Sequence, residues 1–389
     1  MRCKKNRVLF LTRTLGRAGV GVSLMPVLQS LDFEKLDVTL GVQFPEKELE
    51  AQVPRQVKIV YYGEITSWIY QKIFDFNQKL GQKRENPILR FMWHCFNKLE
   101  DLRMAYKVCK CFGGRWDTAT AYHQGMASWY VMKLVNAKKK NLWYHAARVE
   151  QPWYEKLFAK ADTIITDSEN ARQVLLAAWG DGFANKITAM HCILPTEELH
   201  QKAVAPITLA GRAGQTVIFS CGRLDEEKGM DLTVEAAAIV RDTLPDKDFV
   251  WILVGDGSAR ERIRARIEAL GLEDRVLMAG YQSNPYPWFA ACDLYVQPSR
   301  MECFGITIAE ALYFGKPVIS TCSAGGMEQI RHGINGLLCQ ISGESIAEAV
   351  IQYFTDLEVA DAIHTHLQQM DYEQTRKSAA CFINKIHGA

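Results

Sequence analysis

The sequence predicts an α/β protein with two domains, each built on a doubly wound parallel sheet. Its 389 residues are more than a single hydrophobic core usually organises. Short apolar runs rich in β-branched residues alternate with longer amphipathic stretches, a pattern typical of repeated strand–helix–strand units. This alternation stops near the middle of the chain and then starts again, which predicts a linker between two similar halves.

The first half contains short apolar runs that predict buried parallel strands. The first run follows a basic start and is far too short for the apolar segment of a signal peptide. The runs are residues 8–11, 38–43, 57–61, 118–122, 141–144 and 163–166. We expect them to form one sheet in an amino-terminal domain that spans residues 1–198.

The second half repeats the pattern after a stretch that lacks periodicity. Turn residues gather between Pro195 and Gly214, and we place the linker there. The strands expected after it are residues 217–220, 249–254, 276–279, 294–297 and 318–320. They predict a carboxy-terminal domain over residues 199–371, with a ligand-binding cleft between the two domains.

One long segment, residues 68–115, fits this scheme poorly because it is aromatic and basic. It holds ten Lys and Arg against four Asp and Glu. Apolar residues recur in it at helical spacing: Ile88, Met92, Cys95, Leu99, Leu102 and Tyr106. The favoured interpretation is a helix packed on the amino-terminal sheet, and the alternative is a helix that contacts an anionic membrane surface.

Composition excludes several classes of protein. A formal net charge of +2 gives no global reason to expect a nucleic-acid partner. The eleven cysteines lack Cys-x-x-Cys pairs, so they indicate neither a zinc site nor a disulfide framework, and a reducing cytoplasm fits best. No apolar run is long enough to cross a membrane, so we expect a soluble or peripheral protein.

The stretch richest in candidate functional residues is 298–312, where a strand is followed by a loop and then a helix. The helix is expected to begin near Gly305, so its free amide groups predict an anion site. Glu302 lies in the loop, whereas Glu310 lies inside the helix between apolar neighbours. Both could be ordinary solvated glutamates, but the apolar surroundings of Glu310 argue against that.

These residues resemble the Glu-x7-Glu signature of glycosyltransferase family 4, whose members are retaining enzymes of the GT-B fold with two Rossmann-like domains. The resemblance covers nearly the whole second half. It implies that Glu310 holds the ribose of a nucleotide-sugar donor and that Glu302 lies beside the donor sugar. It also implies that amides of Phe304, Gly305 and Ile306 face the sugar and diphosphate, where a helix N-terminus substitutes for a metal.

A second cluster, residues 219–231, is similar to the Gly-Arg-Leu…Lys-Gly element of the same family. The resemblance makes Gly222, Arg223 and Lys228 donor-binding residues, with the two cations on the diphosphate. Such cations suit a leaving group that gains negative charge as its bond to the sugar breaks. A charged turn that caps a helix is the alternative.

Two strand ends in the second half resemble the region that contacts the nucleotide base in family members. Gly255 follows one strand, and Tyr281 follows the next, where it could stack on a base or only pack. The segment Gly325-Gly326-Met327-Glu328 resembles a family loop that shapes the cleft. By contrast, Asp246-Lys247-Asp248 spells a metal-binding Asp-x-Asp but precedes a strand, so we interpret it as a loop.

The family pattern is weaker in the first half. Residues 16–21 look like its glycine-rich loop, with Gly19 as the expected ligand-facing glycine, although Ala18, Val20 and Gly21 depart from the common form. His145 stands where many members have a sugar-contacting histidine, and a structural histidine is equally compatible. Cys192 replaces the usual asparagine and is assigned no role.

The resemblance implies a retaining, metal-independent hexosyltransferase that uses a nucleotide sugar and needs no cofactor. A UDP-sugar is the expected donor, and a saccharide or lipid-linked saccharide of the cell envelope is the expected acceptor. The protein is expected in the cytoplasm or on the inner face of the membrane, with a final helix over about 372–389 that packs on the first domain. Alternatives are a nucleotide-sugar-binding protein without turnover and a nucleotide-sugar epimerase.

Overall fold

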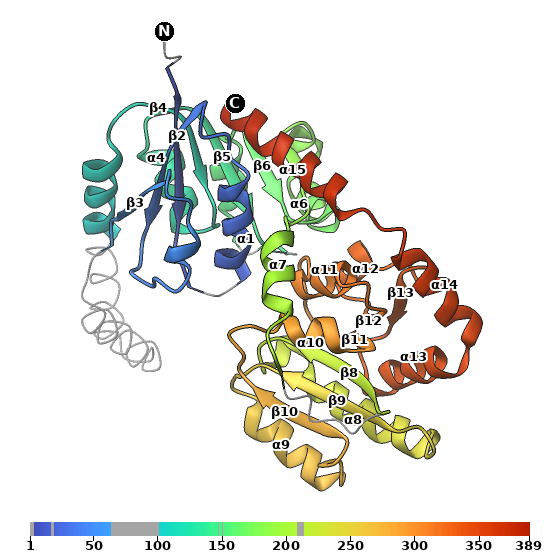
Figure 1. Cartoon of the computed structure of the whole chain (residues 1–389). Coiled ribbons are helices and arrows are strands. Elements are labelled where there is room, and N and C mark those ends of the chain that lie inside the picture. The colour runs from blue at the N-terminus through green and yellow to red at the C-terminus, as the bar shows by residue number, and fades with distance from the viewer. Residues whose placement is uncertain (1–3, 17–18, 64–100, 147, 150, 208–213) are drawn as a thin grey trace. The chain divides into compact units, whose positions relative to one another are not determined.

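The structure is a computed structural model that describes residues 4–16, 19–63, 101–146, 148–149, 151–207 and 214–389. These residues form two compact units, whose elements are labelled in Figure 1. Unit 1 comprises Met1–Thr166, Leu175–Ile193 and Lys377–Ala389, and unit 2 comprises Asp167–Val174 and Leu194–Arg376. The expected boundaries at 198/199 and 371/372 compare with 193/194 and 376/377 here, and residues 167–174, expected in the first domain, group with unit 2.

Unit 1 is built on a parallel sheet with the strand order β3-β2-β1-β4-β5-β6-β7. The strands are β1 (Asn6–Thr12), β2 (Leu36–Val42), β3 (Lys58–Tyr61), β4 (Trp116–Ala121), β5 (Ala137–Tyr144), β6 (Thr163–Thr166) and β7 (Ile187–Ala189). Each predicted run coincides with one of the first six. The chain reverses its direction of travel across the sheet between β1 and β4, as a doubly wound sheet requires.

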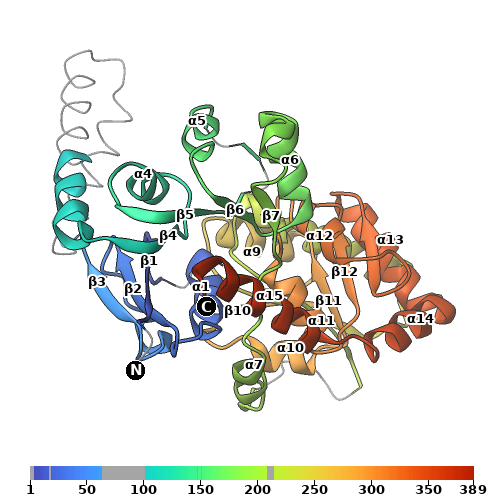
Figure 2. The same cartoon turned by 90° about the horizontal axis from the view of Figure 1, so that it is seen from above.

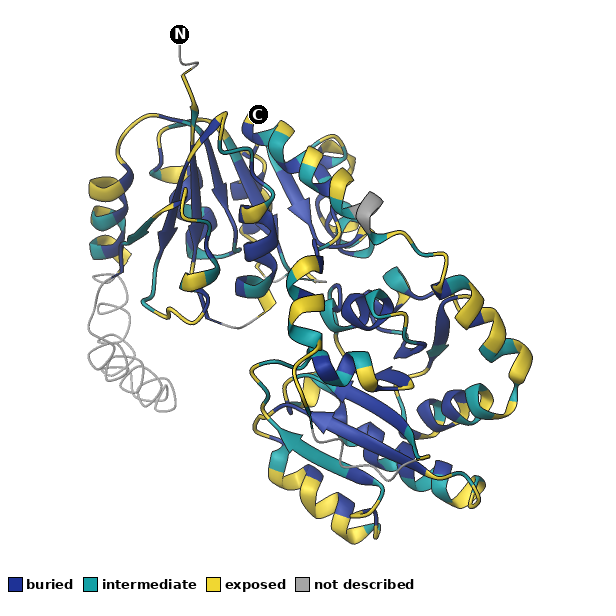
Figure 3. Ribbon diagram, viewed as in Figure 1, coloured by how far each residue is buried: buried dark blue, intermediate teal, exposed yellow. Residues whose placement is uncertain are grey.

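Alternate residues of β1 point to opposite faces of this sheet, and each face carries its own core. Leu9 and Leu11 pack in a cluster with α4 (Met126–Lys133), α5 (Tyr154–Phe158) and the end of α6 (Glu169–Trp179). Val8 and Phe10 pack in the other cluster, with α1 (Gly19–Gln29) and α15 (Tyr372–His387). Figure 2 shows α4 and α1 on opposite sides of the sheet, and Figure 3 shows the strands buried between them.

The carboxy-terminal helix α15 is joined to unit 1 by a set of polar bonds. The Asn384 side chain donates to the carbonyl of Ser30 and accepts from the amide of Asp32, at 2.7 and 2.8 Å. His387 is fully buried, and its Nε2 lies 2.8 Å from the hydroxyl of Thr120. Burial lowers the pKa of His387 to about 4, so the ring is neutral at physiological pH.

Most of the basic segment 68–115, including four of its six predicted stripe residues, lies outside the described residues. Residues 101–112 are described and helical. Leu102 and Tyr106, expected on the sheet-facing stripe, are instead 65% and 64% exposed. Met104, Val108 and Phe112 are buried against the sheet in their place, because these three side chains also recur at four-residue spacing.

Unit 2 is built on a second parallel sheet with the order β10-β9-β8-β11-β12-β13. Its strands are β8 (Thr216–Cys221), β9 (Phe249–Val254), β10 (Val276–Gly280), β11 (Leu294–Gln297), β12 (Val318–Thr321) and β13 (Gly336–Cys339). Its longer helices include α8 (Met230–Thr243), α9 (Arg260–Ala269), α11 (Ile306–Tyr313), α13 (Gly343–Thr355) and α14 (Leu357–Leu367). The expected strands are present, and the second doubly wound sheet is confirmed.

The stretch predicted as an aperiodic linker contains a helix, α7 (Thr196–Ala203). Hydrophobic periodicity does not indicate this helix, because its surface is mostly polar and only Thr196 and Leu199 are buried. Glu198 pairs with Lys202 one turn later, and Glu197 lies in the first turn, where an acidic side chain complements the helix dipole. The stretch expected to lack regular structure is therefore helical over residues 196–203.

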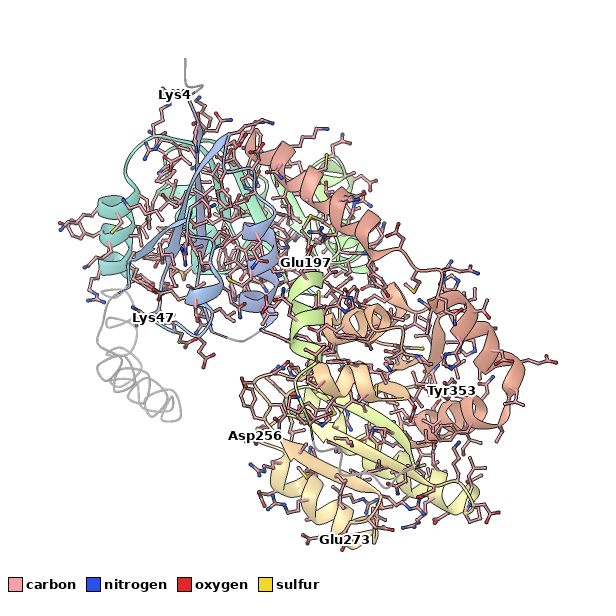
Figure 4. All side chains as sticks on the ribbon, viewed as in Figure 1. Lys4, Lys47, Glu197, Asp256, Glu273 and Tyr353 are labelled. Carbon is pink, nitrogen blue, oxygen red and sulfur yellow. The ribbon has the colours of Figure 1, made fainter. Side chains whose placement is uncertain are left out.

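The two ends of the β9/β10 strand pair can be followed in Figure 4, where Asp256 marks the carboxyl end of β9 and Glu273 precedes β10. Asp248 lies at the opposite end of β9 from Asp256 and pairs with Arg275, Oδ1 to NH1 2.9 Å. The Asp246-Lys247-Asp248 segment is thus a loop at the amino end of a strand, as expected. Among the described residues, no helix is long and apolar enough to cross a membrane.

Candidate active site

Two loops meet at the topological switch point of unit 2, where β8 and β11 lie side by side (Figure 1). The first follows β8 and carries Gly222 to Gly229, and the second follows β11 and carries Pro298 to Gly305. In open parallel sheets, ligands bind outside the carboxyl ends of the strands at such a point. The two predicted clusters of unit 2 are therefore brought together by the fold.

Lys228 and Glu302 face each other across these loops. The Lys228 Nζ atom donates to Glu302 Oε2 at 2.5 Å, and the side chains are 20% and 12% exposed. Lys228 ends a short 3₁₀ helix, Glu226–Lys228, in which the Asp225 carboxylate caps the Lys228 amide. The pair places a cation and a carboxylate, both largely shielded from water, at the switch point, where their interaction is stronger than at an exposed surface.

Glu310 is buried, with 5% of its surface exposed, as its apolar neighbours predicted. It lies in α11, and the hydroxyl of Tyr286 from α10 (Tyr286–Ala291) hydrogen-bonds to its carboxyl group. Burial raises the pKa of Glu310 to about 8, although this hydrogen bond acts in the opposite direction. A buried carboxylate at this pKa needs further donors to stay ionised, and vicinal hydroxyl groups would supply them.

A buried chain of hydrogen bonds, which sequence reasoning missed, leads from the sheet to Glu302. The Tyr295 hydroxyl donates to Gln297 Oε1 at 2.5 Å, and Gln297 Nε2 donates to the Ser299 hydroxyl at 2.7 Å. The Ser299 hydroxyl lies 3.4 Å from Glu302 Oε2, and Thr307 also donates to Gln297 Oε1, at 2.8 Å. A glutamine at the end of an otherwise apolar strand was the signal that could have indicated this network.

Gly305, which has φ +82°, is the N-cap of helix α11. The amides of Ile306 and Thr307 precede the first bond of this turn, from the Ile308 amide to the Gly305 carbonyl, so an anion could accept from them. The short helix α12 (Ala324–Gln329) supports this turn, because Gln329 donates to the carbonyls of Phe304 and Gly305. A side chain on Gly325 would meet the Phe304 carbonyl, its oxygen lying only 2.5 Å from a Cβ. Ile306 is the first residue of the helix.

The strand ends that were expected near the base also stack closely. Gly255 has φ +149°, and a Cβ there would lie 1.8 Å from the Gly222 carbonyl oxygen. Only glycine permits this approach. Tyr281 follows the end of β10 and is 59% exposed. Arg223, by contrast, is 68% exposed and pairs with Asp225 and Glu227 of its own loop rather than with Glu302.

The predicted residues of unit 1 lie at the carboxyl ends of its central strands. The ring of His145 stacks at 6.1 Å on Trp143, its Nε2 lies 3.1 Å from the carbonyl oxygen of Tyr122, and its amide donates to Gln124. These contacts would serve a structural histidine and a ligand-facing one equally. Gly19 has open space around it.

Gly21, two residues after Gly19, is the glycine at which the backbone leaves no room for a side chain. A Cβ on Gly21 would lie 2.1 Å from the carbonyl oxygen of Gly16. His123 lies beside His145, and burial lowers the pKa of His123, an effect to which His145 and Arg13 add. Sequence reasoning did not single out His123.

Comparison with known proteins connects these features to a family. Residues 209–369 match the family described as "Glycosyl transferases group 1". The lipopolysaccharide core biosynthesis glycosyltransferase LpsE of Rhizobium meliloti is 35% identical over 41% of this chain and 45% of its own length. This chain therefore spans less than half of that relative.

A second relative matches over more of its length. It is the N-acetylgalactosamine-N,N'-diacetylbacillosaminyl-diphospho-undecaprenol 4-alpha-N-acetylgalactosaminyltransferase of Campylobacter jejuni. It is 26% identical over 67% of this chain and 71% of its own length.

Solved structures agree on the fold. Anabaena Alr3699/HepE in complex with UDP and glucose matches with a TM-score of 0.64 and 20% identity, over 97% of this chain and 99% of that one. The galactosyltransferase WaaB of the lipopolysaccharide outer core matches with a TM-score of 0.66 and 16% identity, over 97% and 99%. At this identity the likeness shows the GT-B fold of two α/β domains. Residues 209–369 of this chain match the family of group 1 glycosyl transferases. The resemblance drawn from the Glu-x7-Glu stretch is confirmed at that level.

Proposed function

We propose that this protein transfers a hexosyl unit from a nucleotide sugar to a saccharide or lipid-linked acceptor of the cell envelope. We further propose a UDP-sugar as donor, retention of the anomeric configuration, and no requirement for a catalytic metal or other cofactor. The observation that carries the proposal is the Lys228–Glu302 pair at the switch point of unit 2, together with the buried Glu310 in the helix that follows the Glu302 loop. The names of its relatives, among them LpsE, support the same chemistry.

The proposed reaction breaks the bond between the anomeric carbon and the donor phosphate and forms one between that carbon and the acceptor oxygen. The electron pair of the broken bond stays on the diphosphate, and the proton of the acceptor hydroxyl passes to the leaving phosphate. Lys228 and the amides at the start of α11 would stabilise the charge that develops there. Arg223 would add a second cation if its side chain turned from Asp225 towards the phosphate.

The two glutamates have different proposed roles because their surroundings differ. Glu310 is buried and would accept hydrogen bonds from the two ribose hydroxyls, with Tyr286 fixing its orientation. Glu302 is already bonded to Lys228 and would share that cation with the donor. Gly222, Gly255 and Tyr281 would form the surface against the nucleotide. The roles of His145 and Gly19 in unit 1 stay predictions of the family resemblance.

The acceptor and the place of action rest on less direct support. One relative, from Campylobacter jejuni, is named for a diphospho-undecaprenol substrate, which is a lipid-linked saccharide. The exposed Leu102 and Tyr106 support peripheral contact between segment 68–115 and an anionic membrane. We therefore propose action in the cytoplasm at the inner face of the membrane. Vesicles with and without anionic lipid, tested by flotation against a Leu102→Ser/Tyr106→Ser variant, would examine this contact.

Donor binding is the first test. Isothermal titration in EDTA with UDP- and GDP-sugars should give metal-free binding to one base class, and Lys228→Met and Glu310→Ala should each weaken it at least tenfold. Lys247→Met is a matched control, because its Nζ lies over the Phe354 ring, 4.5 Å from the centroid, at the amino end of β9. Equal binding by wild type and both site variants would exclude this site.

Turnover separates transfer from its two alternatives. Donor hydrolysis followed by NMR should release the sugar first as the anomer that the donor carried, as a retaining enzyme requires. Release of the opposite anomer would exclude retention. Donor binding with no hydrolysis and no transfer to any acceptor would favour a binding protein, and conversion of the donor to another nucleotide sugar would favour an epimerase.

A further inference from the structure

Arg300 connects the two loops that carry Lys228 and Glu302. Its guanidinium forms two parallel bonds to the Asp231 carboxylate, Nη1 to Oδ1 2.7 Å and Nη2 to Oδ2 2.8 Å. The same Nη1 group donates to the carbonyl of Glu226 at 3.0 Å. Such a bidentate pair fixes both distance and orientation, which a single ion pair does not.

The backbones of the two loops are joined at the same place. The amide groups of Arg300 and Met301 both donate to the carbonyl of Glu227, at 2.8 and 3.1 Å. On the opposite side of Lys228, Gly229 has φ +65°, and a Cβ there would lie 2.2 Å from the carbonyl oxygen of Pro298. The loop after β11 therefore contacts the loop after β8 at the residue before Lys228 and at the residue after it.

These contacts lie close in sequence to both Lys228 and Glu302. Arg300 lies two residues before Glu302, and its partner Asp231 lies three residues after Lys228. Arg300 and Asp231 are 32% and 26% exposed, so the pair is partly shielded from water. Burial is the largest single influence and would raise the pKa of Asp231. The bonds and the charge of Arg300, with smaller contributions from the Asp231 amide and Arg262, together outweigh burial and lower this pKa. Asp231 is therefore an ionised partner throughout the physiological range.

We propose that Arg300 is a positioning residue for the donor diphosphate: through Asp231 and the carbonyls of Glu226 and Glu227 it sets the distance between Lys228 and Glu302. This role rests on the proposed function, because it concerns the same site. Arg300 itself lies outside the pair that would touch the donor. Replacing Arg300 should keep the positive charge of Lys228 but allow its side chain to move away from the position that it has beside Glu302.

The test is UDP binding by isothermal titration, with amide hydrogen exchange as an independent readout. Arg300→Met and Asp231→Asn should each weaken UDP binding by roughly ten- to hundredfold, since small displacements of binding groups have effects of this size. The double variant should bind no more weakly than Arg300→Met alone. Arg300→Lys, which keeps the charge but loses the parallel bonds, should fall between wild type and Arg300→Met and guards against misfolding of the other variants.

The matched control is Arg275→Met. Arg275 forms an ion pair of similar length with Asp248 in the same unit but at the amino ends of the strands. It should leave UDP affinity within about twofold of wild type, as expected for a partly exposed pair away from the site. Exchange of the amides in segments 226–230 and 299–304 should rise in Arg300→Met and stay unchanged in Arg275→Met.

Coupling to Lys228 separates a positioning role from a general loss of stability. In a Lys228→Met background, Arg300→Met should have little further effect on UDP affinity. Unchanged UDP binding by Arg300→Met, or an equal loss in both backgrounds, would overturn the positioning role and leave the proposed function standing. A wild-type protein that binds no UDP would instead overturn the proposed function, and the positioning role with it.

Discussion

The buried carboxyl group of Glu310 should make donor binding depend on pH. Its pKa is raised to about 8 by burial, while the ribose hydroxyls of the proposed donor would donate to the ionised form. If only that form binds, the apparent dissociation constant scales with one plus ten to the power of pKa minus pH. This factor is about 33 at pH 6.5 and about 1.3 at pH 8.5, so affinity should rise about 25-fold between them.

The assay is isothermal titration with UDP-glucose from pH 6.5 to 9. UDP-glucose is suitable because neither of its phosphates carries a second ionisable proton in this range. Glu310→Gln should bind more weakly at pH 8.5 and should show a flat profile. Tyr286→Phe removes a hydrogen bond that lowers the Glu310 pKa, so its profile should move to higher pH. A flat wild-type profile, or the same slope in Glu310→Gln, would refute the reasoning.

The raised pKa of Glu310 also makes the stability of the protein depend on pH, but stability should fall as pH rises whereas donor affinity should increase. The folded protein keeps a proton on Glu310 between pH 4.5 and about 8, whereas the unfolded chain loses it near 4.5. Stability contributed by this group therefore falls as pH rises through that window and levels off above it. At pH 7.5 the cost is about 4 kcal/mol, and Glu310→Gln should recover much of it in urea unfolding of the empty protein. A variant less stable than wild type at pH 7.5 would contradict this.

Three further predictions concern other parts of the chain. His387 has a pKa lowered to about 4, so the stability of unit 1 should fall by up to about 3 kcal/mol from pH 6.5 to 4; urea unfolding should show this loss in wild type and not in His387→Gln. Gly255→Ala should cost about 2 kcal/mol or more because its Cβ would meet backbone, whereas Gly271→Ala, also at positive φ but in open space, should cost about 1 kcal/mol in the same assay. Lys228→Met should weaken UDP binding more than Arg223→Met does, because Arg223 is held by Asp225, and equal losses would show that Arg223 leaves Asp225 when the donor binds.

Much of the fold follows from the sequence because buried parallel strands are local features. Runs such as residues 249–254 are apolar throughout, and both of their faces are covered, so their composition alone identifies them. Strands β7 and β13 were not predicted because they are short and include small or polar residues, as in Ile187-Thr188-Ala189. Helix α7 escaped because it buries little. Periodicity detects burial rather than secondary structure, and it fails where burial is slight.

The candidate site shows a different limit. The burial of Glu310 was predictable, because the residues one turn away on the same helix face, Ile306 and Phe314, are apolar. The contact between Lys228 and Glu302 was not, since it joins two loops through the strand order β8-β11 rather than through any local pattern. Residue types indicated two separate groups, whereas the fold joins them in one ion pair. In the proposed function a donor would compete with Glu302 for Lys228, and the distance that we propose Arg300 sets between the loops would decide whether both can share that cation.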